Sequence, residues 1–240
     1  MKKILIFLMM ILTVITYAKE KLIVGTNAEF KPYEYIEDGK LQGFDVELMN
    51  KIAEKLGYDL EWKNMSFEGL LPALQMNKID AVIAGLSATE ERKKAVSFSK
   101  PYLKFTSEHS VIVGENSSIQ KKEEIKDKVI GVQIGTIQEQ FAKDLGAQIK
   151  VYNSFTGAFM DVQNQKIDGV IIAKVSGDEY LKNLKGVKEV DIIIDTNPGA
   201  SIAVRKNEIV LAEKFDKIIE ELKNSGEYEI LKEKYFPGQK

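Results

Sequence analysis

The stretch KIDAVIAGLSATEERKK, residues 78–94, decides the fold because its first half returns as KIDGVIIAK at residues 166–174. In both copies a Lys-Ile-Asp segment precedes a short apolar run, which predicts a buried strand. A chance repeat of common residues is the alternative. We expect Asp80 and Asp168 to be turn or strand-entry residues rather than ligands. The repeat indicates two similar units within one chain.

Strand and helix patterns alternate around each copy, which predicts an α/β fold with mostly parallel sheets covered by helices. The first unit is expected to contain strands at 22–25, 60–62 and 81–86, a hairpin turn at 37–40, and helices at 45–56 (capped by Asp45), 67–76 and 89–95. The second is expected to contain strands at 129–133, 149–152, 169–172 and 190–194, and helices at 137–145, 155–165 and 178–184.

Two extended apolar stretches without helical period separate these units, FTSEHSVIVG (105–114) and GASIAVR (199–205), and we expect both to be crossovers. The amphipathic pattern from residue 208 onward must pack on a unit that is already built. We therefore predict a discontinuous first lobe with a second lobe inserted into it. The predicted boundaries are 20–107 plus 200–240 for lobe 1 and 108–199 for lobe 2.

Residues 1–18 predict a secretory signal peptide. Lys2 and Lys3 precede the apolar run Ile4–Ile15, and TYA at 16–18 supplies a cleavage pattern. The run is shorter than the about 20 residues of a membrane span, although an uncleaved N-terminal anchor is the alternative. We expect an exported, periplasmic protein.

The composition excludes several classes of function. The 34 basic and 36 acidic residues are interspersed and give a net charge of −2, so no basic face for nucleic acid is expected. The chain has no Cys for a disulfide, and its single His, His109, has no ligand-like neighbours in sequence. We expect a monomer with no metal, no cofactor and no nucleic-acid partner.

Only the first copy of the repeat continues into a run suited to an anion. Gly85 permits close backbone approach, Ser87 offers a hydroxyl, and Arg92 lies in the first turn of the next helix. A guanidinium can give two parallel charge-assisted hydrogen bonds to a carboxylate. The alternatives are that Ser87 or Thr89 only caps the helix and that Arg92 is a solvated surface charge.

Four runs together resemble the family 3 extracellular solute-binding proteins, which deliver polar amino acids to ABC importers. They are GFDVELMNKIAEKLG (43–57), FEGLLPALQMNKIDAVIAGLSATEERKKAVSFSKPY (67–102), GVQIGTIQE (131–139) and KNSGEYEILKEKYF (223–236). The resemblance implies a two-lobed periplasmic-binding-protein fold joined by two hinge crossovers. It also implies capture of a polar amino acid, or a similar small carboxylate, by hinge closure for a membrane ABC permease.

The resemblance assigns roles at the main-chain end of the ligand. Arg92 corresponds to the clamp of the α-carboxylate, helped by the Ser87 hydroxyl and the backbone amide of Thr136 from the opposite lobe. The Gly85 carbonyl would accept from the α-amino group.

It also assigns the side-chain end. Phe30 and Phe67 match aromatic positions that sandwich the ligand side chain, although core packing is the commoner role of Phe. Asn27 matches a position where relatives selective for cationic side chains often carry Asp, and Gln133 matches one that lines the side-chain end. Because both are neutral amides, we expect a neutral polar ligand side chain to be preferred over Lys or Arg.

The second copy of the repeat departs from the family at Ala173, where relatives usually carry Asp or Glu to hold the ligand ammonium. A buried ammonium without an acid loses a charge-assisted bond. Either the affinity falls, another acid such as Glu29 compensates, or the ligand is not a standard α-amino acid.

Cyclohexadienyl dehydratases resemble the same family and are the enzymatic alternative. Their acid-catalysed elimination needs a general acid in the cleft. Ala173 removes the most obvious position for that acid and leaves Glu29 as a substitute. We therefore expect a binding protein rather than an enzyme.

Overall fold

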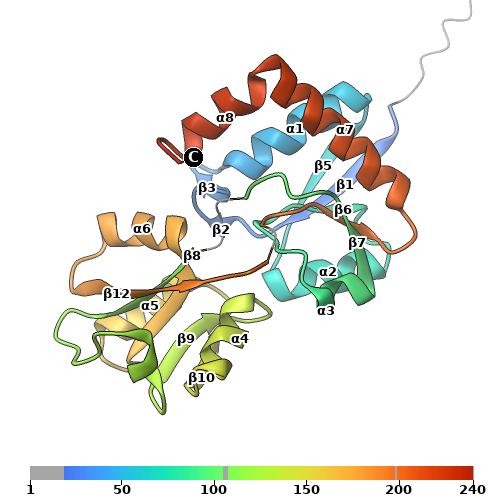
Figure 1. The fold of residues 1–240 in the computed structure, drawn as a ribbon. Coiled ribbons are helices and arrows are strands. Elements are labelled where there is room, and N and C mark those ends of the chain that lie inside the picture. Colours follow the sequence, from blue (N-terminus) through green and yellow to red (C-terminus); the bar gives the residue numbers. More distant parts are fainter. Residues whose placement is uncertain (1–18, 105–107, 198, 240) are drawn as a thin grey trace, which may run out of the picture.

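The computed structural model describes residues 19–104, 108–197 and 199–239, so the expected signal peptide at 1–18 lies outside the described residues. The chain forms two α/β lobes that are joined by connections crossing between them (Figure 1). In the first lobe, buried side chains form one core beneath α1, α7 and α8 and another beneath α2. The second lobe likewise has a core on each side of its sheet.

The elements of the first lobe are β1 (Lys21–Thr26), α1 (Phe44–Leu56), β5 (Asp59–Asn64), α2 (Phe67–Gln75), β6 (Ala81–Val82), α3 (Glu90–Ala95), β7 (Val96–Phe98), β13 (Ala203–Arg205), α7 (Ile209–Ser225) and α8 (Glu227–Tyr235). A small sheet beside them is formed by β2 (Glu29–Phe30), β3 (Glu34–Glu37) and β4 (Lys40–Gln42). The elements of the second lobe are β8 (Glu108–Gly114), a 3₁₀ turn (Lys122–Ile125), β9 (Val129–Gln133), α4 (Ile137–Asp144), β10 (Gln148–Tyr152), α5 (Phe155–Gln163), β11 (Gly169–Ala173), α6 (Lys174–Asn183) and β12 (Val187–Ile194).

The two main sheets share one topology. Their strand orders are β5-β1-β6-β13-β7 and β10-β9-β11-β8-β12. In each sheet the fourth strand, β13 or β8, runs antiparallel to both neighbours, and it is the strand that follows a crossover. The predicted α/β fold with two similar lobes is therefore confirmed.

The two Lys-Ile-Asp segments make the same backbone contacts in their two sheets. The Asp80 carboxylate accepts the N–H of Ile23 at 2.8 Å, and the Asp168 carboxylate accepts the N–H of Val129 at 2.7 Å. The N–H of each aspartate also donates to the carbonyl of the same partner residue, at 2.7 and 2.8 Å. Each aspartate thus holds the start of the neighbouring parallel strand, which confirms that both residues are structural.

The isoleucine ahead of each aspartate also packs in the same way. Ile79 lies over Gly25 of β1, where a Cβ would come within 2.6 Å of its Cδ1. Ile167 lies over Gly131 of β9, where the corresponding distance is 2.8 Å. The repeat is therefore one structural unit used twice, not a chance of composition.

Three local predictions are wrong. Residues 108–114 form β8, a strand paired on both sides, and 203–205 form β13, so the two extended stretches are only partly crossovers. Strand β6 covers Ala81–Val82 rather than 81–86. Asp45 does not cap α1, because Gly43 occupies the N-cap and the buried Asp45 side chain reaches the N–H of Gly85 instead.

The crossovers between the lobes are bonded to each other. The N–H of Ala200 donates to the carbonyl of Leu103, and the N–H of Tyr102 donates to the carbonyl of Ala200, both at 2.9 Å. Gly199 has φ +106, and a Cβ there would lie 2.2 Å from the Leu103 carbonyl oxygen, so this position requires glycine. We propose that the lobes divide within these crossovers, between residues 107 and 108 and between residues 199 and 200.

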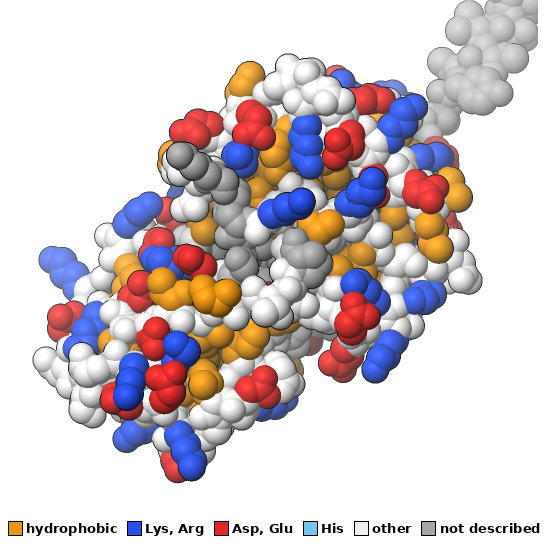
Figure 2. All heavy atoms as spheres, in the orientation of Figure 1, with side chains coloured by type: hydrophobic (Ala, Val, Ile, Leu, Met, Phe, Trp, Pro, Cys, Tyr) orange, Lys and Arg blue, Asp and Glu red, His pale blue; other side chains and the backbone are white. Residues whose placement is uncertain are grey.

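Charged side chains of both signs are interspersed over both lobes on the face drawn in Figure 2. That face has no continuous area of one sign, so nothing on it favours a polyanionic partner. Across the described ranges, no helix combines the length and the apolar character that a membrane span requires.

We expect Asp168→Ala to lower the free energy of unfolding by about 1–3 kcal/mol, because the N–H of Val129 would lose its charged acceptor. Urea denaturation monitored by circular dichroism measures this change. Asp59→Ala is a matched control, since Asp59 is an exposed aspartate at the start of β5. Equal stabilities of the two variants would contradict the structural role of Asp168.

Candidate functional site

A small cavity of about 40 Å³ lies between the two lobes, which are in direct contact across it. Residues of both lobes line it, and every site residue that the sequence predicts is among them. These residues are Asn27, Phe30, Phe67, Gly85, Ser87, Arg92, Gln133, Thr136 and Ala173.

Arg92 dominates the polar side of this cavity. Thr89 caps α3 by accepting the N–H of Arg92 at 3.2 Å, which places Arg92 in the first helical turn. Its guanidinium donates to the carbonyl of Ser87 in the first lobe and to the carbonyl of Gly135 in the second, both at 2.9 Å. The guanidinium also lies 5.5 Å from the centre of the Phe67 ring.

The guanidinium of Arg92 has no carboxylate within 4.0 Å among the described residues. Burial lowers the pKa of Arg92 to about 10, although Glu91 and Asp195 oppose this, so the group remains charged at neutral pH. A largely buried cation whose partners are neutral carbonyls can still gain a charge-assisted bond to an anion. The arrangement therefore suits a carboxylate, and Arg92 is not a solvated surface charge.

A second direct contact between the lobes involves two neutral amides. The Gln133 amide nitrogen donates to the Asn27 side-chain oxygen at 2.9 Å and to the Asn153 carbonyl at 3.0 Å. The Asn27 amide nitrogen donates to the Met65 carbonyl at 2.9 Å. These bonds orient both amides and give this part of the cavity a polar, uncharged wall.

Aromatic rings enclose the cavity from both lobes. Phe30 stacks on Tyr33 with ring centres 4.9 Å apart, and its ring lies 6.3 Å from that of Phe155 on the second lobe. Phe67 lies at the first turn of α2, against Arg92. Phe155 and Tyr33 were missed in the sequence because a phenylalanine or tyrosine at a strand or helix end reads as core.

Two predicted site residues differ in detail from their expected roles. The hydroxyl and the N–H of Thr136 both donate to the Gln133 carbonyl, at 2.7 and 3.3 Å, so the amide expected to face a carboxylate takes part in a turn. Ala173 is buried at the end of β11, opposite His109 of β8. The next residue, Lys174, is a cation and cannot replace the missing acid; it pairs with Asp178 at 2.6 Å and Glu189 at 3.2 Å.

The cavity also contains residues that the sequence did not single out. Apart from Tyr33 and Phe155, they are Glu34, Ala84, His109, Ile137 and Gln138. The His109 Nδ1 lies 3.0 Å from the Gln138 amide nitrogen, and its Nε2 lies 3.8 Å from the Asp195 carboxylate. His109 and Asp195 therefore connect the two chain segments that enter and leave the second lobe.

A buried pair of carboxyl groups lies at the Gly85 end of the cavity. Asp45 accepts the N–H of Gly85 at 2.8 Å and the hydroxyl of Tyr102 at 2.7 Å. Burial raises the pKa of Asp45 to about 6, against the lowering effect of these hydrogen bonds. Burial and the nearby Asp45 charge raise the pKa of Glu34 well above its ordinary value. Burial thus favours the protonated form of each of these two carboxyls.

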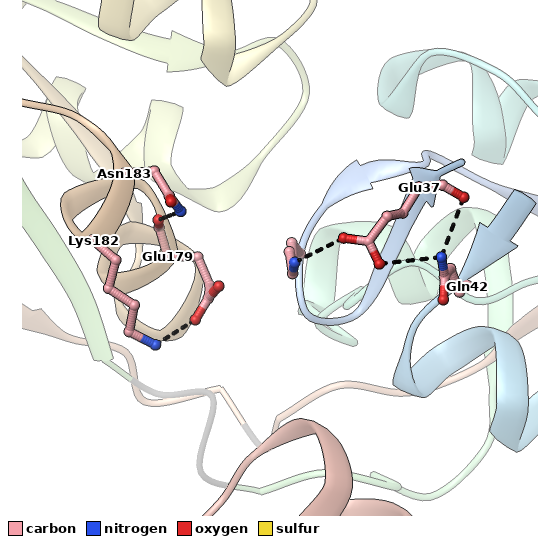
Figure 3. Close-up of polar contacts among 6 residues, drawn as sticks. Glu37, Gln42, Glu179, Lys182 and Asn183 are labelled. Atoms are coloured by element: carbon pink, nitrogen blue, oxygen red, sulfur yellow. Dashed lines mark hydrogen bonds and ion pairs between the residues drawn. The ribbon is translucent and has the colours of Figure 1, made fainter. Parts of the chain in front are cut away.

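Glu29, the acid that the sequence offered as a substitute for the missing one, does not line this cavity. It is exposed and lies in a separate hollow between the β3–β4 hairpin and α6. Figure 3 shows polar contacts of the two elements nearby: the Gln42 amide donates to Glu37 in the hairpin, and Lys182 donates to Glu179 in α6. These contacts join residues of the same lobe, so they do not hold the lobes together.

The described residues contain no group of three or more His, Cys, Asp or Glu side chains arranged to hold a metal ion.

Comparisons with known proteins match the whole described fold. The family model of the bacterial extracellular solute-binding proteins, family 3, matches residues 22–238. The chain is 37% identical over 229 residues to the arginine-binding extracellular protein ArtP of Bacillus subtilis, covering 92% of this chain and 88% of that protein. It is 36% identical over 215 residues to a probable histidine-binding protein of Campylobacter jejuni, covering 88% and 83%.

Solved structures give the same result. An ancestral arginine-binding protein bound to arginine is 41% identical, with a TM-score of 0.84 over 91% of this chain and 99% of that one. An ancestral arginine-binding protein bound to glutamine is 40% identical, with a TM-score of 0.85 over 92% and 100%.

We expect the carboxyl pair to make the stability of the protein fall as pH rises above about 5. The folded protein keeps protons on Asp45 and Glu34 that the unfolded chain releases near its ordinary pKa values of 3.8 and 4.5. The stabilisation is present below those values and is lost as pH rises through the higher folded pKa values. Glu34→Gln cannot ionise and should reduce the fall between about pH 5 and pH 8 by on the order of 1–3 kcal/mol.

Urea denaturation at the two pH values, with the exposed Glu29→Gln as control, measures the difference. Parallel profiles of wild type and Glu34→Gln would mean that burial does not raise the pKa of Glu34.

Proposed function

Because the chain belongs to the bacterial extracellular solute-binding proteins of family 3, we propose that it captures a polar L-α-amino acid in the cavity between its lobes. The names of its relatives support an amino acid as the ligand, since they describe arginine-, histidine- and cystine-binding proteins. The observation that carries the proposal is Arg92, a partly buried cation without a carboxylate partner among the described residues.

The ligand stabilises a closed arrangement by contacting both lobes at once. Its carboxylate pairs with Arg92, and its side chain lies between Phe30 and Phe67 against the amides of Asn27 and Gln133. Each lobe alone offers only part of these contacts, so closure is favoured when the ligand is present. The Gly85 carbonyl accepts from the ammonium, and Ser87 and Thr136 complete the carboxylate end.

The partner of the closed form is a membrane ABC permease. Relatives named as binding proteins of ABC transporters support this assignment. We propose that the chain is cleaved after residue 18 and acts as a monomer in the periplasm. The family description as extracellular supports export.

The dehydratase alternative gains no support from the comparisons. The family and the relatives are named as binding proteins, and Ala173 places no acid at the end of β11. Glu29, the substitute acid, lies outside the cavity. Binding without covalent chemistry is the function that the family and the named relatives support.

Arg92→Ala should weaken amino-acid binding by at least about 2 kcal/mol, because the ligand carboxylate would be buried without its cation. Isothermal titration calorimetry with a panel of L-amino acids measures the loss. Lys93→Ala is the matched control, since Lys93 follows on the same helix and pairs with Glu90 at 2.7 Å instead. An unchanged affinity of the Arg92→Ala variant would mean that Arg92 does not contact the ligand.

We expect L-glutamine to bind more tightly than L-arginine, because Asn27 and Gln133 offer hydrogen bonds without a negative charge. Competition between the two ligands in the same titration gives the order directly. Tighter binding of L-arginine would mean that a carboxylate reaches the side-chain end of the cavity.

A further inference from the structure

An amino-acid ligand brings an ammonium group into a cavity where β11 ends in Ala173. The next residue, Lys174, is a cation that pairs with Asp178 and Glu189. The exposed Glu29 lines a separate hollow outside this cavity. Glu34 is the remaining candidate for an anionic partner, since it is the acidic residue among the described residues that line this cavity, with both carboxyl oxygens buried.

The position of Glu34 fits the ammonium end of the ligand. Glu34 interacts with Asp45, and Asp45 is bonded to the N–H of Gly85, the residue whose carbonyl faces the ammonium in the proposed binding mode. A Cβ on Gly85 would lie 2.9 Å from the Phe30 ring and 3.6 Å from the Tyr33 ring. The carboxyl pair, Gly85 and these two rings therefore form one end of the cavity.

The hydrogen bonding of Glu34 is incomplete. Its side chain is fully buried, and neither carboxyl oxygen accepts a hydrogen bond from an N–H or O–H group of the described residues. A bond between Glu34 and Asp45 requires a proton on one of them, and Asp45 already accepts from two donors. A buried carboxyl without a donor is costly, and a cationic donor would satisfy it.

We propose that Glu34 is the anionic partner of the ligand ammonium and replaces the acid that is absent at residue 173. This assignment rests on the proposed amino-acid function. The carboxyl of Glu34 holds the proton of the pair when the cavity has no cation. As the ammonium enters, that proton leaves to the solvent, and the carboxylate accepts an N–H from the ligand in its place.

Other ionisable groups near this pair do not substitute for Glu34. Tyr33 and Tyr102 remain protonated, because burial and the negative charges of the pair raise the pKa of each well above its ordinary value. Arg92 and His109 line the same cavity but offer cations or a ring nitrogen rather than a carboxylate. Asp45 is not among the residues that line the cavity, and its Oδ2 accepts from Gly85 and Tyr102.

Calorimetric titration of wild type and Glu34→Gln tests the proposal, with L-glutamine or L-arginine, whichever binds wild type more tightly. We expect Glu34→Gln to bind at least about tenfold more weakly, and Glu29→Gln to bind as wild type does. Repeating the titration in buffers of different ionisation enthalpy should show proton release for wild type and none for Glu34→Gln. If Glu34 had only a structural role, its replacement would not change the number of protons released on ligand binding.

Equal affinity and equal proton release in wild type and Glu34→Gln would overturn the assignment while leaving the amino-acid function in place. Failure of wild type to bind any amino acid would instead overturn the proposed function itself.

Ala173→Asp is a second test that does not depend on the folding of Glu34→Gln. Because Glu34 already supplies the negative charge, the added carboxylate should tighten binding less than about threefold. A gain of about tenfold or more would show that the ammonium had no partner in wild type and would overturn the proposal.

Discussion

The ability of the cavity to bind an anion depends on the largely buried guanidinium of Arg92, which is bonded only to backbone carbonyls. Arg92 joins the carbonyl of Ser87 in one lobe to that of Gly135 in the other, and no carboxylate among the described residues neutralises it. Neutral acceptors compensate its burial only in part, so an anion entering the cavity gains a strong interaction. Because Arg92 contacts both lobes, it would couple the ligand charge to lobe closure in the proposed function.

The scaffold around Arg92 is symmetric, whereas the site is not. Asp80 and Asp168 make the same bonds to the neighbouring strand in the two sheets. Beyond those strands the copies diverge: one leads into α3 with Arg92 in its first turn, and the other ends in Ala173. The repeated structural unit thus gives each of the two main sheets a similar edge at the cavity. The residues that follow each copy determine what that edge can bind.

Much of the site could be predicted because its residues lie in short segments at strand ends and helix starts, where a local motif carries the chemistry. Gly85, Ser87 and Arg92 are of this kind. Glu34 could not be recognised, since a glutamate in a hairpin strand is expected to be solvent-exposed, whereas Glu34 is fully buried near Asp45 of α1. Asp45 was misread as a helix cap for the same reason.

The fold shows the same division between local and distant information. Helix and strand patterns from 129 to 173 were predicted closely because they are set by local periodicity. The extended residues 108–114 were misread, since their place as an antiparallel strand within the second sheet depends on pairing with β11 and β12 far along the chain. Strand order of this kind leaves no local signal in the sequence.

In the proposed binding mode, an amino acid lies between the lobes. Its carboxylate pairs with Arg92, and its ammonium lies at the Gly85 end beside Glu34. A crystal structure of the protein grown with its tightest-binding amino acid tests this most directly. We expect a ligand carboxylate oxygen about 3 Å from the Arg92 guanidinium. We expect the ligand ammonium within hydrogen-bond distance of the Gly85 carbonyl and a Glu34 oxygen. A ligand with its ammonium directed toward the second lobe, or bound outside this cavity, would contradict it.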